Sequence, residues 1–206
     1  GHSVDVLLTL YPHSSESHLL HYPNIEFTQL QAESMKTPQL IEEISSDDSE
    51  NESKKLDNLI SLAKEKYSID GIVHGGILSE YQKNNFSLIC EKNHLEIISP
   101  LWNKEPESYM KELLNENFEY IISTVSSDGL NDSWLGQIID KNGLDELQKL
   151  QKKFRFNLNF EGGEAETFVT NCPLFEKRLL IQDSITEWDG YRGRFEILEA
   201  KLKDNA

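Results

Sequence analysis

Short apolar runs alternate with stretches of helical spacing along most of this chain. Residues 4–10 are mainly aliphatic or β-branched and end at Tyr11-Pro12, which predicts a strand buried on both faces. Apolar residues then recur at helical spacing over 56–67, and an apolar run over 69–76 ends in a glycine pair. The alternation predicts αβ units in a doubly wound parallel sheet, with ligands at the carboxyl ends of the strands.

The same rhythm continues toward the end of the chain. Helical spacing predicts further helices over residues 80–91, 106–116 and 144–154. Apolar or alternating runs predict further strands over residues 94–101, 118–125, 156–160, 179–181 and 195–198, the last two on either side of a turn at 188–190. A second structural unit is expected to begin near residues 126–129, and no internal repeat is found.

Charge and composition narrow the classes of function. The 206 residues carry a formal net charge of −16 at pH 7, which disfavours binding to nucleic-acid backbones and anionic membranes. No run approaches about 18 apolar residues, and no signal segment opens the sequence, so a cytoplasmic protein is expected. Cys90 and Cys172 have no C-x-x-C spacing, which favours reduced, buried thiols.

Acidic residues concentrate in one stretch, residues 42–52, which holds six carboxylates and no basic residue. The run predicts a solvated, mobile loop. The alternative, a site for a metal or a basic partner, is disfavoured because calcium loops need glycine and ligands at fixed spacing.

The segment with the clearest chemistry is E-G-G-E-A-E at 161–166. A glycine pair lets backbone amides approach a ligand, while Glu161, Glu164 and Glu166 crowd within six positions. Crowded carboxylates raise one another's pKa unless a cation, a metal or water separates them, so a binding site is favoured. A Gly-Gly hairpin turn with exposed acids is the alternative.

Two other segments follow predicted strands. Gly75, Gly76 and Ser79 place a hydroxyl and free helix amides where an anion could dock, or Ser79 is simply a helix N-cap. Trp134 lies in the loop 128–136 and is interpreted as an exposed, ligand-facing ring, with a core tryptophan as the alternative. His13, His18 and His21 match no zinc spacing, and no metal ligands are assigned.

Together these segments resemble the diphthine-ammonia ligase family. The similarity rests on H-Y-P-N-I-E at 21–26 with L-Q-A-E at 30–33, G-G-I-L-S-E-Y-Q at 75–82, P-L-W at 100–102, G-L-N-D-S-W-L-G at 129–136, E-G-G-E-A-E-T-F-V at 161–169 and P-L-F at 173–175. These blocks are collinear. The family belongs to the N-type ATP pyrophosphatases.

The resemblance implies a fold and a reaction. The fold is α/β, a Rossmann-like doubly wound parallel sheet of the adenine nucleotide alpha hydrolase type with a smaller C-terminal α/β domain. Residues 1–104 would form the nucleotide-binding domain, and residues 105–206 the acceptor-binding domain. The reaction converts diphthine on elongation factor 2 to diphthamide with ammonia, and ATP, used with Mg²⁺, yields AMP and pyrophosphate. No nucleic acid or membrane is expected as a partner, and a homo-oligomer is left open.

Candidate site residues follow from the same resemblance. The carboxylates suit catalysis, although the sequence does not assign separate roles to Glu161, Glu164 and Glu166. Nucleotide binding is expected at Thr9, Tyr11, Gly75, Gly76 and Ser79. Substrate binding is expected at His21, Asn24, Tyr81, Gln82, Trp134, Gly162, Gly163 and Thr167, with Trp134 facing the trimethylammonium of diphthine.

The chain also departs from the family pattern. The opening pyrophosphate loop, S-G-G-K-D-S, does not occur in it, which favours an incomplete N-terminus. Lys83 and Gln137 stand where the family commonly has Arg, and neither reproduces a bidentate guanidinium. Two alternatives therefore remain: a non-catalytic nucleotide-binding or interaction protein, and a related ATP pyrophosphatase with a different acceptor.

Overall fold

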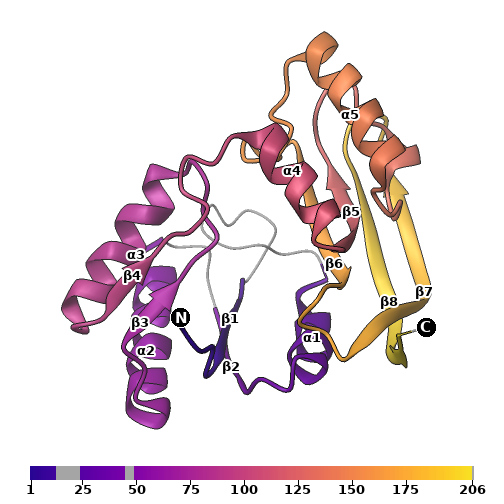
Figure 1. Ribbon diagram of the computed structural model, residues 1–206. Coiled ribbons are helices and arrows are strands. Elements are labelled where there is room, and N and C mark those ends of the chain that lie inside the picture. Colours follow the sequence, from indigo (N-terminus) through magenta and orange to yellow (C-terminus); the bar gives the residue numbers. More distant parts are fainter. Residues whose placement is uncertain (13–23, 45–48, 206) are drawn as a thin grey trace. The chain divides into compact units, whose positions relative to one another are not determined.

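The computed structural model describes residues 1–12, 24–44 and 49–205 (Figure 1). These residues divide into two compact units. The first unit comprises Gly1–Ile25 and Lys36–Asn103, and the second comprises Glu26–Met35 and Lys104–Ala206. No helix among the described residues is long and apolar enough to cross a membrane.

The first unit is built from parallel strand pairs and helices. Strand β1 (Leu7–Tyr11) pairs with β2 (Gln39–Glu43), and β3 (Gly71–Val73) pairs with β4 (Glu96–Ile98), both in parallel. Helices α2 (Ser49–Tyr67) and α3 (Glu80–Lys92) precede β3 and β4. The αβ alternation is confirmed, but the described strands form two separate two-stranded sheets rather than one.

The predicted acidic loop at 42–52 is wrong at both of its ends. Glu42 and Glu43 belong to β2, and helix α2 begins at Ser49. Glu50 and Glu52 lie in the first turn of α2, where the partial positive charge of a helix N-terminus stabilises carboxylates. Residues 45–48 lie outside the described part.

One hydrophobic cluster holds the first unit together. Helix α2 supplies Leu56, Leu59 and Ile60, which pack with strand residues Leu10 and Ile72. Ile89, Cys90 and Leu95 join the cluster from α3 and the loop after it, and Ile44 joins it from the position directly after β2. The helical spacing read from the sequence therefore marks the buried face of α2, and the buried cysteine is free, as expected.

The second unit contains an antiparallel sheet in the order β6-β5-β8-β7. Its elements are η1 (Ile25–Phe27, which begins one residue before this unit), α1 (Thr28–Ser34), α4 (Pro106–Asn115), β5 (Glu119–Val125), η2 (Asp132–Trp134), α5 (Lys141–Phe154), β6 (Ala165–Asn171), β7 (Lys177–Trp188) and β8 (Gly193–Asp204). The parallel sheet expected from the alternation therefore does not extend into this unit. The two short closing strands are instead halves of a hairpin with 12-residue strands.

The predicted strand at 156–160 is also wrong. Phe156, Leu158 and Phe160 are all buried, which explains the period-two pattern. The backbone nevertheless turns on itself, since the Phe160 amide donates to the Asn157 carbonyl at 3.0 Å. Every second side chain of this loop is buried, although the loop pairs with no strand. The sequence pattern therefore resembled that of a strand.

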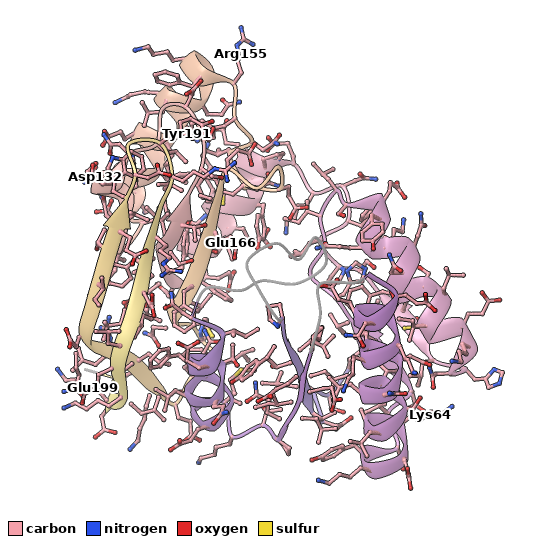
Figure 2. All side chains as sticks on the ribbon, turned by 180° about the vertical axis from the view of Figure 1, so that it is seen from behind. Lys64, Asp132, Arg155, Glu166, Tyr191 and Glu199 are labelled. Atoms are coloured by element: carbon pink, nitrogen blue, oxygen red, sulfur yellow. The ribbon has the colours of Figure 1, made fainter. Side chains whose placement is uncertain are left out.

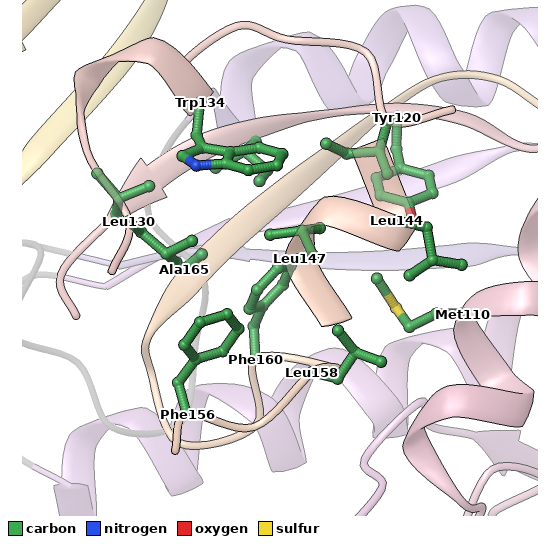
Figure 3. Packing of buried hydrophobic residues seen from close by; sticks show 13 residues of the cluster. Met110, Tyr120, Leu130, Trp134, Leu144, Leu147, Phe156, Leu158, Phe160 and Ala165 are labelled. Carbon is green, nitrogen blue, oxygen red and sulfur yellow. The ribbon is translucent and has the colours of Figure 1, made fainter. Parts of the chain in front are cut away.

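The central strand β5 of the second unit is packed on both of its faces. Tyr120 and Ile122 of β5 pack into one cluster with α4 and α5, which Figure 3 shows from close by. Ile121, between them, packs into a second cluster with Phe168 and Leu30 of α1. Residues 120–122 thus alternate between two cores.

Segment 26–35 is fastened to the second unit by hydrogen bonds far apart in sequence. Gln31 Nε2 donates to the Val169 carbonyl at 2.8 Å, and the Lys177 amide donates to Ser34 Oγ at 3.1 Å. The Ser34 carbonyl also accepts from the Glu176 amide at 2.9 Å. The hydrophobic pattern of the sequence did not predict α1 or its place in this unit.

Candidate functional site

The first candidate region is the turn after β3, residues 74–79. His74 is 7% exposed, and its backbone amide donates to the Ile98 carbonyl of β4 at 3.1 Å. Its Nδ1 accepts from the Gly76 amide at 3.1 Å, and its Nε2 lies 2.8 Å from Ser99 Oγ. Because Nδ1 accepts a hydrogen bond, Nε2 carries the proton and donates to Ser99.

His74 is a residue that the sequence reasoning missed. Its ring stacks on Phe86 of α3, with the ring centroids 5.0 Å apart. Burial, and then the nearby charge of Lys83, lower the pKa of His74 below its usual value, which keeps the imidazole neutral. The available signal was its position, between an apolar run and a glycine pair.

Ser79 has the N-cap geometry that formed the alternative interpretation. Its hydroxyl accepts from the Gln82 amide at 3.3 Å, and α3 begins at the next residue. Tyr81 on the first turn is 47% exposed. Anion docking at Gly75, Gly76 and Ser79 stays a prediction.

The loops after β3 and β4 are joined at further points. The Asn103 amide donates to the Ile77 carbonyl at 2.9 Å. Lys83 Nζ lies 3.9 Å from the centroid of the Trp102 ring, in a cation–π contact. Lys83 therefore stacks on the tryptophan of the P-L-W segment.

The remaining nucleotide candidates lie on β1. Thr9 Oγ1 accepts from Gln39 Nε2 at 2.7 Å, and the Tyr11 carbonyl accepts from the Ile44 amide at 2.9 Å.

The substrate candidate Asn24 is 4% exposed and has a positive φ of 59°. His21 lies outside the described residues.

The second candidate region is the 157–164 loop, and Glu164 organises it. Its Oε1 accepts from the Asn157 amide at 2.7 Å and from Asn157 Nδ2 at 2.8 Å. Its Oε2 accepts from the Gly162 amide at 2.8 Å. Hydrogen-bond donors of the loop therefore surround this carboxylate.

Close packing at Gly162 and backbone conformation at Gly163 both favour glycine. A Cβ at Gly162 would lie 2.7 Å from Glu164 Oε1, so a side chain there would displace the carboxylate from its present position. Gly163 has φ of +78°, which favours glycine, and its carbonyl accepts from Ser126 Oγ at 2.5 Å. The backbone turns at these glycines, but the turn does not join two strands of a hairpin, and Glu161 and Glu164 are only half-exposed. Ligand binding at the exposed glycines stays a prediction.

The other two carboxylates are placed differently. Glu166 on β6 (Figure 2) is in register with Thr124 of β5, which is in register with Arg194 of β8, so these side chains share one face of the sheet. Arg194 is ion-paired with Glu187 at 2.9 Å. Glu161 contributes, after burial, to raising the pKa of Tyr109, which places its charge near α4. Thr167, beside Glu166, is exposed.

The interpretation of Trp134 as an exposed, ligand-facing ring was wrong. The side chain is 4% exposed and packs in the cluster that also contains Leu130, Leu147 and Ala165 (Figure 3). The 3₁₀ turn η2, capped by Asn131, directs it into the core. A ring enclosed by aliphatic side chains has no face open to a trimethylammonium group.

Within the described ranges, no group of three or more His, Cys, Asp or Glu side chains is placed to hold a metal ion.

These features define an α/β protein of two units, each with a polar loop built around a glycine pair. The sequence model of the diphthamide synthase N-terminal domain matches residues 1–97, and that of the C-terminal domain matches residues 105–202. The chain therefore belongs to the diphthamide synthase family.

Individual relatives agree with this membership. The diphthine–ammonia ligase of Bos taurus is 36% identical over 135 residues, which are 65% of this chain and 50% of that protein. The Homo sapiens protein of the same name is 35% identical over the same length and shares. The Saccharomyces cerevisiae protein is 28% identical over 171 residues, which are 75% of this chain and 24% of that protein. The chain thus spans about half the length of its mammalian relatives.

Proposed function

We propose that this chain belongs to an ATP-dependent ligase that converts diphthine on elongation factor 2 to diphthamide with ammonia. A carboxylate oxygen of diphthine attacks the α-phosphorus of ATP, pyrophosphate leaves, and ammonia then displaces AMP from the acyl adenylate. The observation that carries the proposal is the match of both diphthamide synthase domain models, in order, along one chain.

The proposed fold of the first unit is a doubly wound, Rossmann-like sheet. Both strand pairs are parallel, and helices α2 and α3 connect β2 to β3 and β3 to β4. Parallel strands joined by helices are the building units of such sheets. The residues through 104, apart from the segment 26–35, would then form the nucleotide-binding domain, and those from 105 onward, together with that segment, the acceptor-binding domain.

In this proposal the nucleotide lies at the carboxyl ends of β1 and β3. A Cβ built at Gly75 would meet nothing within 4 Å, so a ligand can approach the main chain there. Backbone groups open to approach are what nucleotide sites of this class use. The residues assigned to the nucleotide are Thr9, Tyr11, Gly75, Gly76 and Ser79.

The acidic residues take separate roles in this proposal. Glu164 is a positioning residue, because loop donors occupy both of its oxygens. Glu161 and Glu166 act on the acceptor. Substrate binding is assigned in the second unit to Gly162, Gly163 and Thr167, and elsewhere in the chain to His21, Asn24, Tyr81 and Gln82. Mg²⁺ in such sites is held by one or two carboxylates together with phosphates, so no protein ligand set is assigned to it.

The test uses the full open reading frame that contains this chain. Purified protein, ATP, ammonium and diphthine-bearing elongation factor 2 should yield AMP and diphthamide. Glu166→Gln should reduce AMP release at least tenfold, while Glu199→Gln, an exposed change on β8, should leave the rate unchanged. No diphthamide from the parent protein, or equal rates for both variants, would contradict the proposal.

A second candidate function is a nucleotide-binding protein without ligase activity. Two charged side chains favour it, because each is engaged within the protein: Glu164 accepts hydrogen bonds from its own loop, and Lys83 stacks on Trp102. Calorimetry separates the two functions. ATP binding without AMP release, under conditions where a known diphthine–ammonia ligase is active, would support this second candidate.

A further inference from the structure

We propose that His74 is a positioning residue of the nucleotide site, joining the turn after β3 to the loop after β4 through its neutral imidazole. This inference rests on the proposed function, since it concerns the site assigned above to ATP. His74 was not among the candidate residues, and its role is to hold the backbone that the nucleotide meets rather than to touch the reacting atoms.

The link between the two loops uses both ring nitrogens of His74, and we call these two contacts the His74 clamp. Nδ1 accepts from the Gly76 amide at 3.1 Å, on the turn after β3. Nε2 meets Ser99 Oγ at 2.8 Å, on the residue directly after β4. One side chain thus spans the carboxyl ends of two neighbouring parallel strands.

Packing fixes the ring in this orientation. It stacks on Phe86 with an interplanar angle of 1°, and the side chain is 7% exposed. The strands behind it are three residues long. Since such short strands contribute few hydrogen bonds, a side-chain link between their ends adds to the contacts that order the two loops.

Only the neutral ring can make both contacts. A second proton, on Nδ1, would face the Gly76 N–H and replace an attraction with a repulsion between two donors. The charged group that acts on the ring is Lys83 of α3, while Phe86, Ser99 and the Gly76 amide carry no charge. Burial and Lys83 both lower the pKa of His74, so acid is needed to open the clamp.

Three substitutions separate the contacts. His74→Asn keeps an acceptor near Nδ1, His74→Gln keeps a donor near Nε2, and His74→Phe keeps only the ring. His94→Asn is the matched control, because His94 is exposed and its positive φ of 53° suits asparagine.

The experiment measures the dissociation constant of ATP by calorimetry in the full-length protein at about pH 7.5 and about pH 5.5, on either side of the usual histidine pKa. At the higher pH, His74→Phe should bind ATP about tenfold more weakly than the parent, with His74→Asn and His74→Gln between them. Acid should weaken binding more in the parent than in His74→Asn. Since the phosphates of ATP also take up protons near this range, each variant is compared with the parent at the same pH.

Parent-like affinity and parent-like pH dependence in His74→Phe would overturn the inference, as would tighter binding by the parent in acid. A second measurement, made on the parent protein, tests the inference even if a variant does not fold. The Gly76 amide signal in the NMR spectrum of nucleotide-free protein should shift along the same titration curve as the His74 ring, and independent titrations would also overturn the clamp. If the two titrate together but the parent binds no ATP, the clamp stands and the proposed nucleotide site fails.

Discussion

The chain has two glycine pairs, at 75–76 and at 162–163. In each loop one polar side chain accepts a hydrogen bond from a glycine amide, but the two side chains, His74 and Glu164, do so differently. Glu164 offers a carboxylate whose two oxygens accept from the Asn157 and Gly162 amides. His74 offers one ring nitrogen to the Gly76 amide and must keep its proton on the other for Ser99. The first arrangement needs one charged acceptor, and the second needs one particular tautomer.

The surroundings of the two loops differ as well. The 157–164 loop is anchored by Phe156, Leu158 and Phe160 in a large core. The 74–79 turn follows a three-residue strand and relies on the contact with Phe86. The comparison indicates a loop in the second unit that a carboxylate and a large core hold together, and a turn in the first unit that depends on one titratable hydrogen bond and one ring contact.

Removing the core under the 157–164 loop should have the largest effect. Trp134→Ala should lower the free energy of unfolding of the second unit by about 3–5 kcal/mol, because it leaves a cavity beneath Ala165 and Leu147. Urea unfolding with hydrogen exchange of the β5 and β6 amides measures it. Trp134→Phe is the control and should cost much less. An Ala variant as stable as the parent would contradict the burial.

Breaking the acceptor of the same loop should have the next largest effect. Glu164→Gln replaces a carboxylate with a group that presents an NH₂ to backbone donors, so stability should fall by about 1–3 kcal/mol. Glu166→Gln should change it by less than about 0.5 kcal/mol. Thermal melts and exchange of the Asn157 and Gly162 amides give the readout. Identical melts for the two variants would remove Glu164 from its role in the loop.

The glycines themselves sharpen the comparison. Gly163→Ala forces a side chain onto φ of +78° and should cost about 1 kcal/mol of stability. Gly75→Ala should cost less than about 0.5 kcal/mol, because its Cβ would enter open space. Denaturant midpoints of the two variants test this. Equal losses would mean that the two glycine pairs are under the same constraint.

The smallest expected effect is the pH dependence of the first unit. The folded-state pKa of His74 lies below its unfolded value of 6.5, so the unfolded chain binds the proton more readily. Stability of the first unit should therefore be unaffected above about pH 6.5 and should fall as the pH drops from there toward the lowered pKa. Urea unfolding across this range should show the loss in the parent and a smaller one in His74→Asn. No difference between the two proteins would contradict the shift.

Much of the secondary structure was predictable from spacing. The helices expected over 80–91 and 106–116 appear as Glu80–Lys92 and Pro106–Asn115. Ser79 and Glu105 cap them with side-chain oxygens. Such signals are local, because a helix and its cap satisfy their hydrogen bonds within a few residues.

What the sequence did not show has a common cause. The E-G-G-E-A-E segment made Glu164 a candidate catalytic acid, but the segment does not show that Asn157, seven residues earlier, donates to it. The alternation of apolar and polar residues at 156–160 arises because Phe156, Leu158 and Phe160 pack into the core with α4 and α5, not because the segment pairs with a strand. His74 stood out only once Ser99 and Phe86 were brought beside it.

The amino-acid order alone determined most of the helices, most of the strands and the family resemblance, because these depend on residue spacing and on short segments. Tertiary structure decided that Trp134 is buried, that residues 26–35 join the second unit and that His74 links two loops. Each of these depends on contacts between residues distant in sequence, such as Gln31 with Val169. Burial and hydrogen-bond partners are properties of such contacts, and no periodicity along one segment encodes the partner on another.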